Sequence, residues 1–177
     1  MDTNVKRSIV LIFLLCVGYF PSFGQQADTS RQFLLTAARE IIKSAGKVAL
    51  ITQDEEGIPQ IRTMDPFEPE EDFTVWLATQ PNTRKVQQIK NNNQVTLYYP
   101  DKADMGYVVI HGRAELVNDQ KETDIHWKNE WKNFYTNRTD AYILIKVTPH
   151  YLELINYNRG VLGDPQTWRP AFVRFKN

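Results

Sequence analysis

The stretch from Thr79 to Tyr99 constrains the fold more than any other part of the sequence. A β-forming run at 73–78 ends at Thr79, and the turn Gln80–Asn82 leads into a short helix that opens at Thr83. The segment 94–99 then returns as a strand. Such a unit places the unpaired backbone N–H groups of a helix start beside strand ends. These N–H groups and the helix dipole favour a bound anion, so the stretch predicts an anion site.

Cationic and hydroxyl side chains gather around this helix start. Arg84 and Lys85 follow the Thr83 hydroxyl, and Arg62 lies on a preceding strand. A phosphate dianion favours about two cations and several charge-assisted hydrogen bonds, so these residues are candidates for a phosphate site. Taken singly, each has a simpler interpretation. Arg62 would be a surface residue paired with an acid of 65–72, and the other two cations would form an ordinary solvated helix turn.

The first 24 residues have the pattern of a Sec-type signal peptide. Lys6–Arg7 precedes an apolar run at 9–17 that is too short to span a bilayer comfortably. Small residues at Ser22 and Gly24 predict cleavage after Gly24 and export to the periplasm. An uncleaved N-terminal anchor is the alternative. The only cysteine, Cys16, lies in this segment, so no disulfide is expected within the mature chain.

Residues 25–177 are predicted to form a single domain that has no membrane association after cleavage. The whole chain carries 21 basic and 21 acidic residues, which gives no electrostatic indication of nucleic-acid binding. Its three histidines, His111, His126 and His150, lie far apart and lack metal-ligand spacing. No metal site is therefore predicted.

The hydrophobic pattern predicts a mainly β fold with small helices. A helix is expected from an N-cap at 28–30 to Gly46, with strands at 48–52, 58–64, 73–78, 94–99, 107–117, 142–147 and 151–155. A further helix is expected from Asp119, with Ile125, Trp127, Trp131 and Phe134 on its apolar side. The acidic segment 65–72 is expected to be a solvated connection, Gly106 and Gly112 to allow a bend or close approach, and the tail from Asn156 to be irregular. Six or seven strands with small helices indicate a barrel or sandwich.

The order of these features resembles the FMN-binding split barrel of the pyridoxamine 5'-phosphate oxidase-like superfamily, and most closely its general stress protein 26 branch. The segments that carry the resemblance are 46–52, 57–64, 75–79, 83–89, 95–99 and 108–114. The resemblance covers 33–155. It implies a six- to seven-stranded antiparallel split β-barrel that forms a homodimer, with flavin mononucleotide (FMN) held between the two subunits.

The resemblance also implies which residues bind the cofactor: Arg62, Thr63, Met64, Leu77, Ala78, Thr79, Thr83, Arg84, Lys85 and Trp168. Arg62 and Lys85 would hold the phosphate, helped by the Thr83 hydroxyl and Arg84. The backbone around Met64 and from Leu77 to Thr79 would meet the flavin ring. Trp168, in the tail, would either cover the partner's flavin or pin the tail.

The function that the resemblance implies is a flavin-dependent oxidoreductase acting on an unknown small substrate, and no catalytic residue stands out. The tail 167–175 lacks the arginine–x–histidine motif of the pyridoxamine-phosphate oxidases themselves, so vitamin B6 oxidation is not expected. One alternative is a non-catalytic binding protein for flavin, haem, deazaflavin or another flat anionic ligand. Another is an exported barrel that holds no cofactor and acts through protein contacts.

Overall fold

The computed structural model describes residues 31–135, 137 and 140–176. The predicted signal peptide and N-cap lie outside the described residues. The elements are α1 (Arg31–Ala45), β1 (Val48–Gln53), β2 (Pro59–Met64), β3 (Val75–Thr79), α2 (Arg84–Asn91), β4 (Gln94–Pro100), β5 (Tyr107–Val117), α3 (Gln120–Ile125), η1 (Asn129–Asn133), β6 (Ile143–Ile155), η2 (Tyr157–Arg159) and β7 (Ala171–Arg174). The strands and their order agree with the mainly β prediction. No helix among the described residues is long and apolar enough to cross a membrane.

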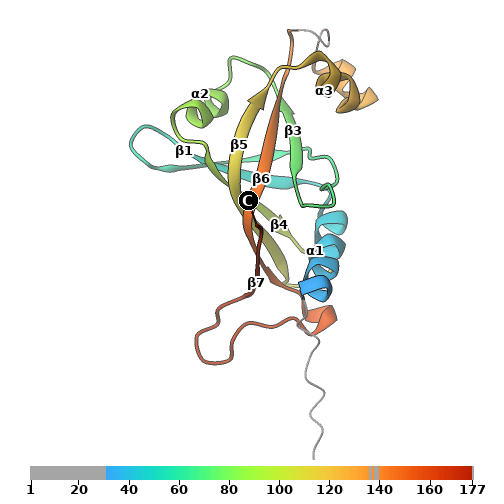
Figure 1. Cartoon of the computed structure of the whole chain (residues 1–177), viewed down its shortest axis with the longest axis vertical. Helices are drawn as coiled ribbons and strands as arrows, with labels where there is room; N and C mark the ends of the chain where they lie inside the picture. The colour runs from blue at the N-terminus through green and yellow to red at the C-terminus, as the bar shows by residue number, and fades with distance from the viewer. Residues whose placement is uncertain (1–30, 136, 138–139, 177) are drawn as a thin grey trace, which may run out of the picture.

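The seven strands form one antiparallel sheet. Its order is β2-β1-β4-β5-β6-β3, and β7 pairs with the free part of β6. The β1–β2 hairpin runs across the long strands β5 and β6 (Figure 1), so the sheet is strongly coiled around its own core. Helix α1 buries Leu34, Ala38 and Ile41 against this core at the spacing that the sequence predicts.

Strand β6 is a single strand of 13 residues, whereas the sequence predicts two strands separated at Thr148–Pro149. The register shifts opposite Pro149, between His111 and Gly112, and at such a bulge the missing proline N–H costs little. The predicted close approach at Gly112 is confirmed, because a Cβ there would lie 2.4 Å from the carbonyl oxygen of Thr148. The pairing of β5 with β6 therefore continues through Pro149, where we expected β6 to be interrupted.

The helix predicted from Asp119 is shorter than expected. The Asp119 carboxylate does cap it, accepting a hydrogen bond from Glu122 N at 3.1 Å, but α3 ends at Ile125 and η1 follows as a separate turn. His126 leaves helical geometry at φ −96° and ψ 58°, and its ring stacks on Trp76 of β3. Ile125 and Phe134, expected on an apolar side, are 59% and 72% exposed.

The tail from Asn156 is more regular than predicted. The turn η2 and the strand β7 both lie in it. Strand β7 has four residues and pairs only with β6, and such a short edge strand leaves little periodic pattern in a sequence.

Candidate functional site

Three cations meet at the start of α2. Arg62 of β2, Arg84 and Lys85 line a small cavity of about 330 Å³ together with Thr83. Within the described residues, none of the three forms an ion pair with a carboxylate. The cluster therefore carries positive charge without a compensating acid, and the alternative interpretation that paired Arg62 with an acid of 65–72 is wrong.

Arg62 is held by two neutral acceptors. Its guanidinium Nη1 donates to Thr52 Oγ1 at 2.6 Å and Nη2 donates to Gln88 Oε1 at 3.0 Å. Thr52 Oγ1 in turn donates to Gln88 Oε1 at 2.6 Å. Burial and then the charge of Arg84 lower the pKa of Arg62. The side chain is thus fixed in place while its charge remains unpaired.

Lys85 reaches back over the helix start. Its Nζ donates to Thr79 Oγ1 at 3.0 Å, and that hydroxyl lies 3.3 Å from Thr83 Oγ1. Burial first, and then the charges of Arg62 and Arg84, lower the pKa of the Lys85 ammonium. The Thr83 side chain does not cap α2, so the first backbone N–H groups of the helix are left to an anion. An anion placed here would offset both the burial of the ammonium and its repulsion by the two arginines.

A larger pocket of about 740 Å³ adjoins this cluster and shares Thr83 and Lys85 with it. The predicted cofactor residues that line the larger pocket are Thr63, Met64, Ala78, Thr79, Thr83 and Lys85. Arg62 and Arg84 line only the small cavity. Of the ten predicted residues, Leu77 and Trp168 line neither space.

Ala78 lines the pocket and Leu77 does not, because the backbone groups of successive residues in β3 point to opposite edges of the strand. Phe67 N donates to Trp76 O at 2.9 Å, on the edge of β3 away from β6. The backbone groups of alternate residues point to the same edge, so those of Ala78 face the pocket while those of Leu77 bond to β6. The Leu77 side chain is fully buried in the core. Ala78 is therefore the backbone contact that β3 offers to a ligand.

Trp168 lies far from this site within the same chain. It is 80% exposed and adopts φ 58°, in the loop before β7 that lies at the opposite end of the molecule from α2 (Figure 1). Its backbone N–H donates to Asp164 O at 2.8 Å. Any contact with a flavin would have to be made on another subunit.

The far wall of the pocket was missed by sequence reasoning. Lys47, Asp65 and the aromatic residues of η1 and its C-terminal end line it. The acidic segment 65–72 is exposed along half of its length, as expected of a solvated connection. Its first residue differs, because Asp65 Oδ1 accepts from Lys47 Nζ at 2.9 Å and lies 3.0 Å from Lys128 Nζ. Asp65 Oδ2 accepts from Trp131 Nε1 at 3.1 Å. Burial alone would raise the pKa of Asp65, but these hydrogen bonds lower it overall.

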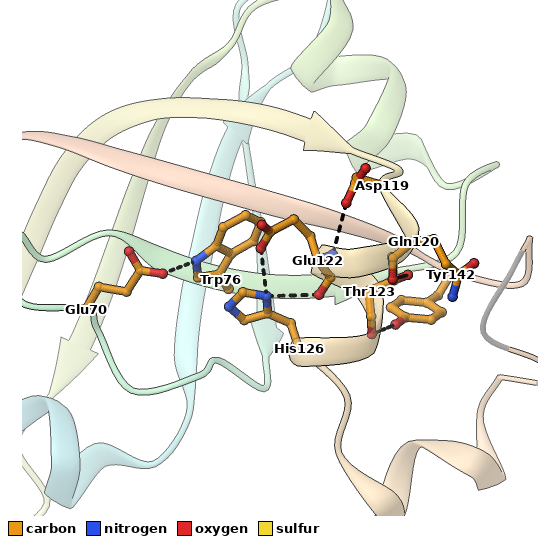
Figure 2. A network of polar contacts seen from close by, with 8 residues as sticks. All are labelled: Glu70, Trp76, Asp119, Gln120, Glu122, Thr123, His126 and Tyr142. Atoms are coloured by element: carbon orange, nitrogen blue, oxygen red, sulfur yellow. Dashed lines mark hydrogen bonds and ion pairs between the residues drawn. The ribbon is translucent and has the colours of Figure 1, made fainter.

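A polar and aromatic network fixes this wall to the sheet. The His126 ring stacks on Trp76 of β3 (Figure 2), with the centroids 4.2 Å apart. Trp76 Nε1 donates to Glu70 Oε1 at 2.6 Å. In the last turn of α3, the hydroxyl of Tyr142 donates to the carbonyl oxygen of Thr123. Two contacts therefore attach the C-terminal half of α3, just before the segment that carries the far wall.

Known proteins share both the sequence pattern and the fold of this chain. The profile of the family described as pyridoxamine 5'-phosphate oxidase like matches residues 35–155. The general stress protein 26 from Bacillus anthracis Sterne is similar at 26% identity and a TM-score of 0.64, over 80% of this chain and 98% of that one. A general stress protein 26-related protein from Clostridium acetobutylicum is similar at 24% identity and a TM-score of 0.64, over 71% and 89% of the two chains.

A NimC/NimA family protein from Clostridium acetobutylicum shares the fold at 16% identity and a TM-score of 0.56, over 70% of this chain and 88% of that one. A search of curated proteins gives no significant match. The split-barrel fold predicted from sequence is confirmed by these structures.

Proposed function

The chain belongs to the pyridoxamine 5'-phosphate oxidase-like family, and from this premise we propose that it binds FMN. The phosphate lies at the cluster of Arg62, Arg84 and Lys85, and the ring lies in the adjoining pocket. The observation that carries the proposal is the absence, among the described residues, of a carboxylate paired with any of these cations. Three unpaired cations at a helix start suit a phosphate dianion.

The two cavities fit a ligand with one anionic end and one flat end. They share Thr83 and Lys85, so a single molecule can occupy both. Met64 supplies apolar surface, and the free backbone edge at Ala78 supplies a donor and an acceptor for polar ring atoms. The described lining contains no histidine or cysteine, although Met64 and Tyr135 belong to residue types that can ligate haem iron. The preference for flavin over haem therefore rests on the cation cluster at the helix start, which suits a phosphate.

The activity we propose is a flavin-dependent oxidoreduction of a small substrate. FMN, when bound, supplies the transfer of electrons or hydride between a donor and that substrate. The residues of this chain bind the phosphate, orient the ring and exclude water. A non-catalytic flavin-binding protein would share all of these contacts, and it would differ by failing to reoxidise with substrate turnover.

We also propose a homodimer with the sites at its interface. A cross-strand row runs over the outer face of the sheet through Ile61, Ile51, Thr96, His111 and Tyr151. Ile61 is 69% exposed, and a sheet face with exposed apolar residues favours association. In such a dimer the Trp168 loop of one subunit would be available to the other.

Export is proposed from the predicted signal peptide at residues 1–24. Soluble nicotinamide reductants are scarce outside the cytoplasm. A membrane quinol or a partner redox protein would therefore have to supply electrons in the periplasm.

The test is a comparison of FMN with riboflavin, which lacks the phosphate. Titration of the purified protein, followed by flavin absorption and fluorescence, should show clear preference for FMN. The double variant Arg62→Gln, Lys85→Gln should lose that preference. Lys90→Gln, which alters an exposed lysine of α2 outside both cavities, is the matched control. An FMN preference that survives in the double variant would place the phosphate elsewhere.

A further inference from the structure

The larger pocket has a second wall that the proposed flavin does not explain. Trp131, Phe134 and Tyr135 line it together with Met64 and Ala78. Trp131 is buried, but Phe134 is 72% exposed. A large apolar ring left open on a pocket wall marks a surface that a ligand can cover.

Two lysines on this side of the pocket converge on one carboxylate. Lys47 and Lys128 both contact one oxygen of Asp65. Lys128 is further engaged by the carbonyl of Pro66 at 2.6 Å. The Lys47 side chain is 61% exposed, and its one hydrogen bond among the described residues goes to Asp65. It therefore keeps N–H groups for a second acceptor.

The net charge of the pocket limits the ligand. Three lysines and two carboxylates line it, and Lys85 belongs to the phosphate cluster. Without Lys85, the charges of Lys47 and Lys128 are balanced by those of Asp65 and Glu130. A ligand with one negative charge is therefore repelled less than a dianion, and its anionic group depends on the free N–H groups of Lys47.

The wall is held in place before any ligand arrives. The stack of His126 on Trp76 and the bond from Tyr142 to Thr123 attach α3 to the sheet (Figure 2). Lys128 Nζ lies 5.6 Å from the centroid of the Trp131 ring. A rigid aromatic surface next to a cation is suited to a flat anion.

We propose that this half of the pocket binds a planar aromatic carboxylate as the substrate class. Its ring covers Phe134 and Tyr135, and its carboxylate accepts hydrogen bonds from Lys47. The inference rests on the proposed function, because FMN occupies the other half and the phosphate cluster.

The test is a calorimetric titration of the FMN-saturated protein with 2-naphthoate. Two probes serve as comparisons: 2-naphthamide removes the charge, and cyclohexanecarboxylate removes the flat ring. Naphthoate should bind at least about tenfold more tightly than either, which is the scale of one hydrogen bond to a charged group. Equal affinity for naphthoate and naphthamide would overturn the proposal.

Single substitutions test where 2-naphthoate binds. Lys47→Gln should weaken naphthoate binding about tenfold, and Phe134→Ala about threefold to tenfold, the scale of an aromatic pair. Lys43→Gln and Ile125→Ala are matched controls, since both residues are exposed and outside the pocket lining. If Phe134→Ala disperses an oligomer and leaves naphthoate affinity unchanged, the ring serves a subunit contact and the proposal fails.

Failure of flavin binding is distinguished from failure of this site. FMN uptake is measured first, and the naphthoate titration is then run with and without flavin. Selective binding that Lys47→Gln weakens supports the aromatic carboxylate site even in a protein that takes up no FMN. Naphthoate that inorganic phosphate displaces, and that Arg62→Gln rather than Lys47→Gln weakens, occupies the phosphate cluster and overturns the inference.

Discussion

The imidazole of His126 lies on the indole of Trp76, with ring centroids 4.2 Å apart and an interplanar angle of 26°. Trp76 belongs to β3, whose end residues line the pocket, and His126 directly follows α3. The rings of Phe67 and His126 form a T-shaped pair with their centroids 5.2 Å apart. This contact joins the sheet side of the pocket to the segment that carries its far wall.

Replacing His126 by Ala should therefore destabilise the protein. The variant loses the stack on Trp76 and the contact of Nδ1 with the carbonyl oxygen of Glu122 at 3.0 Å, together about 2 kcal/mol. Urea unfolding followed by tryptophan fluorescence measures the loss. Lys121→Ala, at an exposed position of α3, should change the free energy of unfolding by less than about 0.5 kcal/mol. Equal effects of the two variants would mean that the stack stabilises nothing.

Asp65 predicts a specific acid sensitivity. Its pKa is lowered in the folded protein, since the hydrogen bonds from Lys47, Lys128 and Trp131 outweigh burial. The unfolded chain then takes up the proton first, so the stabilisation is complete above about pH 4 and is lost as pH falls through the lower folded pKa. Asp65→Asn should be less stable than wild type by about 1 kcal/mol at pH 7. That gap should close in urea titrations below about pH 4, and a gap independent of pH would contradict the assignment.

Local patterns were enough to predict most of the fold. The hairpin of β1 and β2 follows from two short β-forming runs on either side of the turn at Gly57, and α1 follows from its apolar spacing. The grouping of the cations at the start of α2 was also predictable, because Thr83, Arg84 and Lys85 are consecutive, and their binding of a phosphate stays a prediction. Only Arg62 had to be brought in from another strand.

The far wall could not be predicted in the same way. Asp65 and Lys128 lie 63 positions apart in the sequence, and their contact depends on where the path after α3 crosses the sheet. A proline normally argues against a continuous strand, so β6 was divided at Pro149. The unpredicted pocket wall and the division of β6 both concern places where tertiary contacts decide the local structure.

The Tyr99 hydroxyl predicts a stabilising substitution. Its side chain is fully buried, and its oxygen has no hydrogen-bond partner among the described residues. Burial also raises the pKa of this phenol, so the group stays neutral. Removing an unsatisfied buried hydroxyl should gain about 1 kcal/mol in Tyr99→Phe.

The matched control is Tyr142→Phe, which should lose about 1 kcal/mol because that hydroxyl donates to the carbonyl oxygen of Thr123. Thermal and urea unfolding of both variants provide the measurement. A loss of stability in Tyr99→Phe would show that a water molecule satisfies the hydroxyl in solution.

Gln88 provides the sharpest prediction for the proposed phosphate site. It is nearly buried, and its Oε1 accepts both from Thr52 Oγ1 and from Arg62 Nη2. Gln88→Glu keeps the shape of the side chain but places a carboxylate 3.0 Å from the guanidinium. The arginine is then neutralised within the protein, and the preference for FMN over riboflavin should fall by about tenfold, the scale of one charge-assisted hydrogen bond.

Gln88→Leu separates the effect of the charge of Arg62 from the effect of its position. It removes the acceptor and adds no negative charge, so Arg62 keeps its full charge but loses one of its two anchors, and the FMN preference should fall less than in Gln88→Glu. Urea midpoints of both variants show how far each is folded, and the flavin titrations are run well below them. Because Gln88 touches no ligand cavity itself, an undiminished FMN preference in Gln88→Glu would mean that Arg62 does not contact the phosphate.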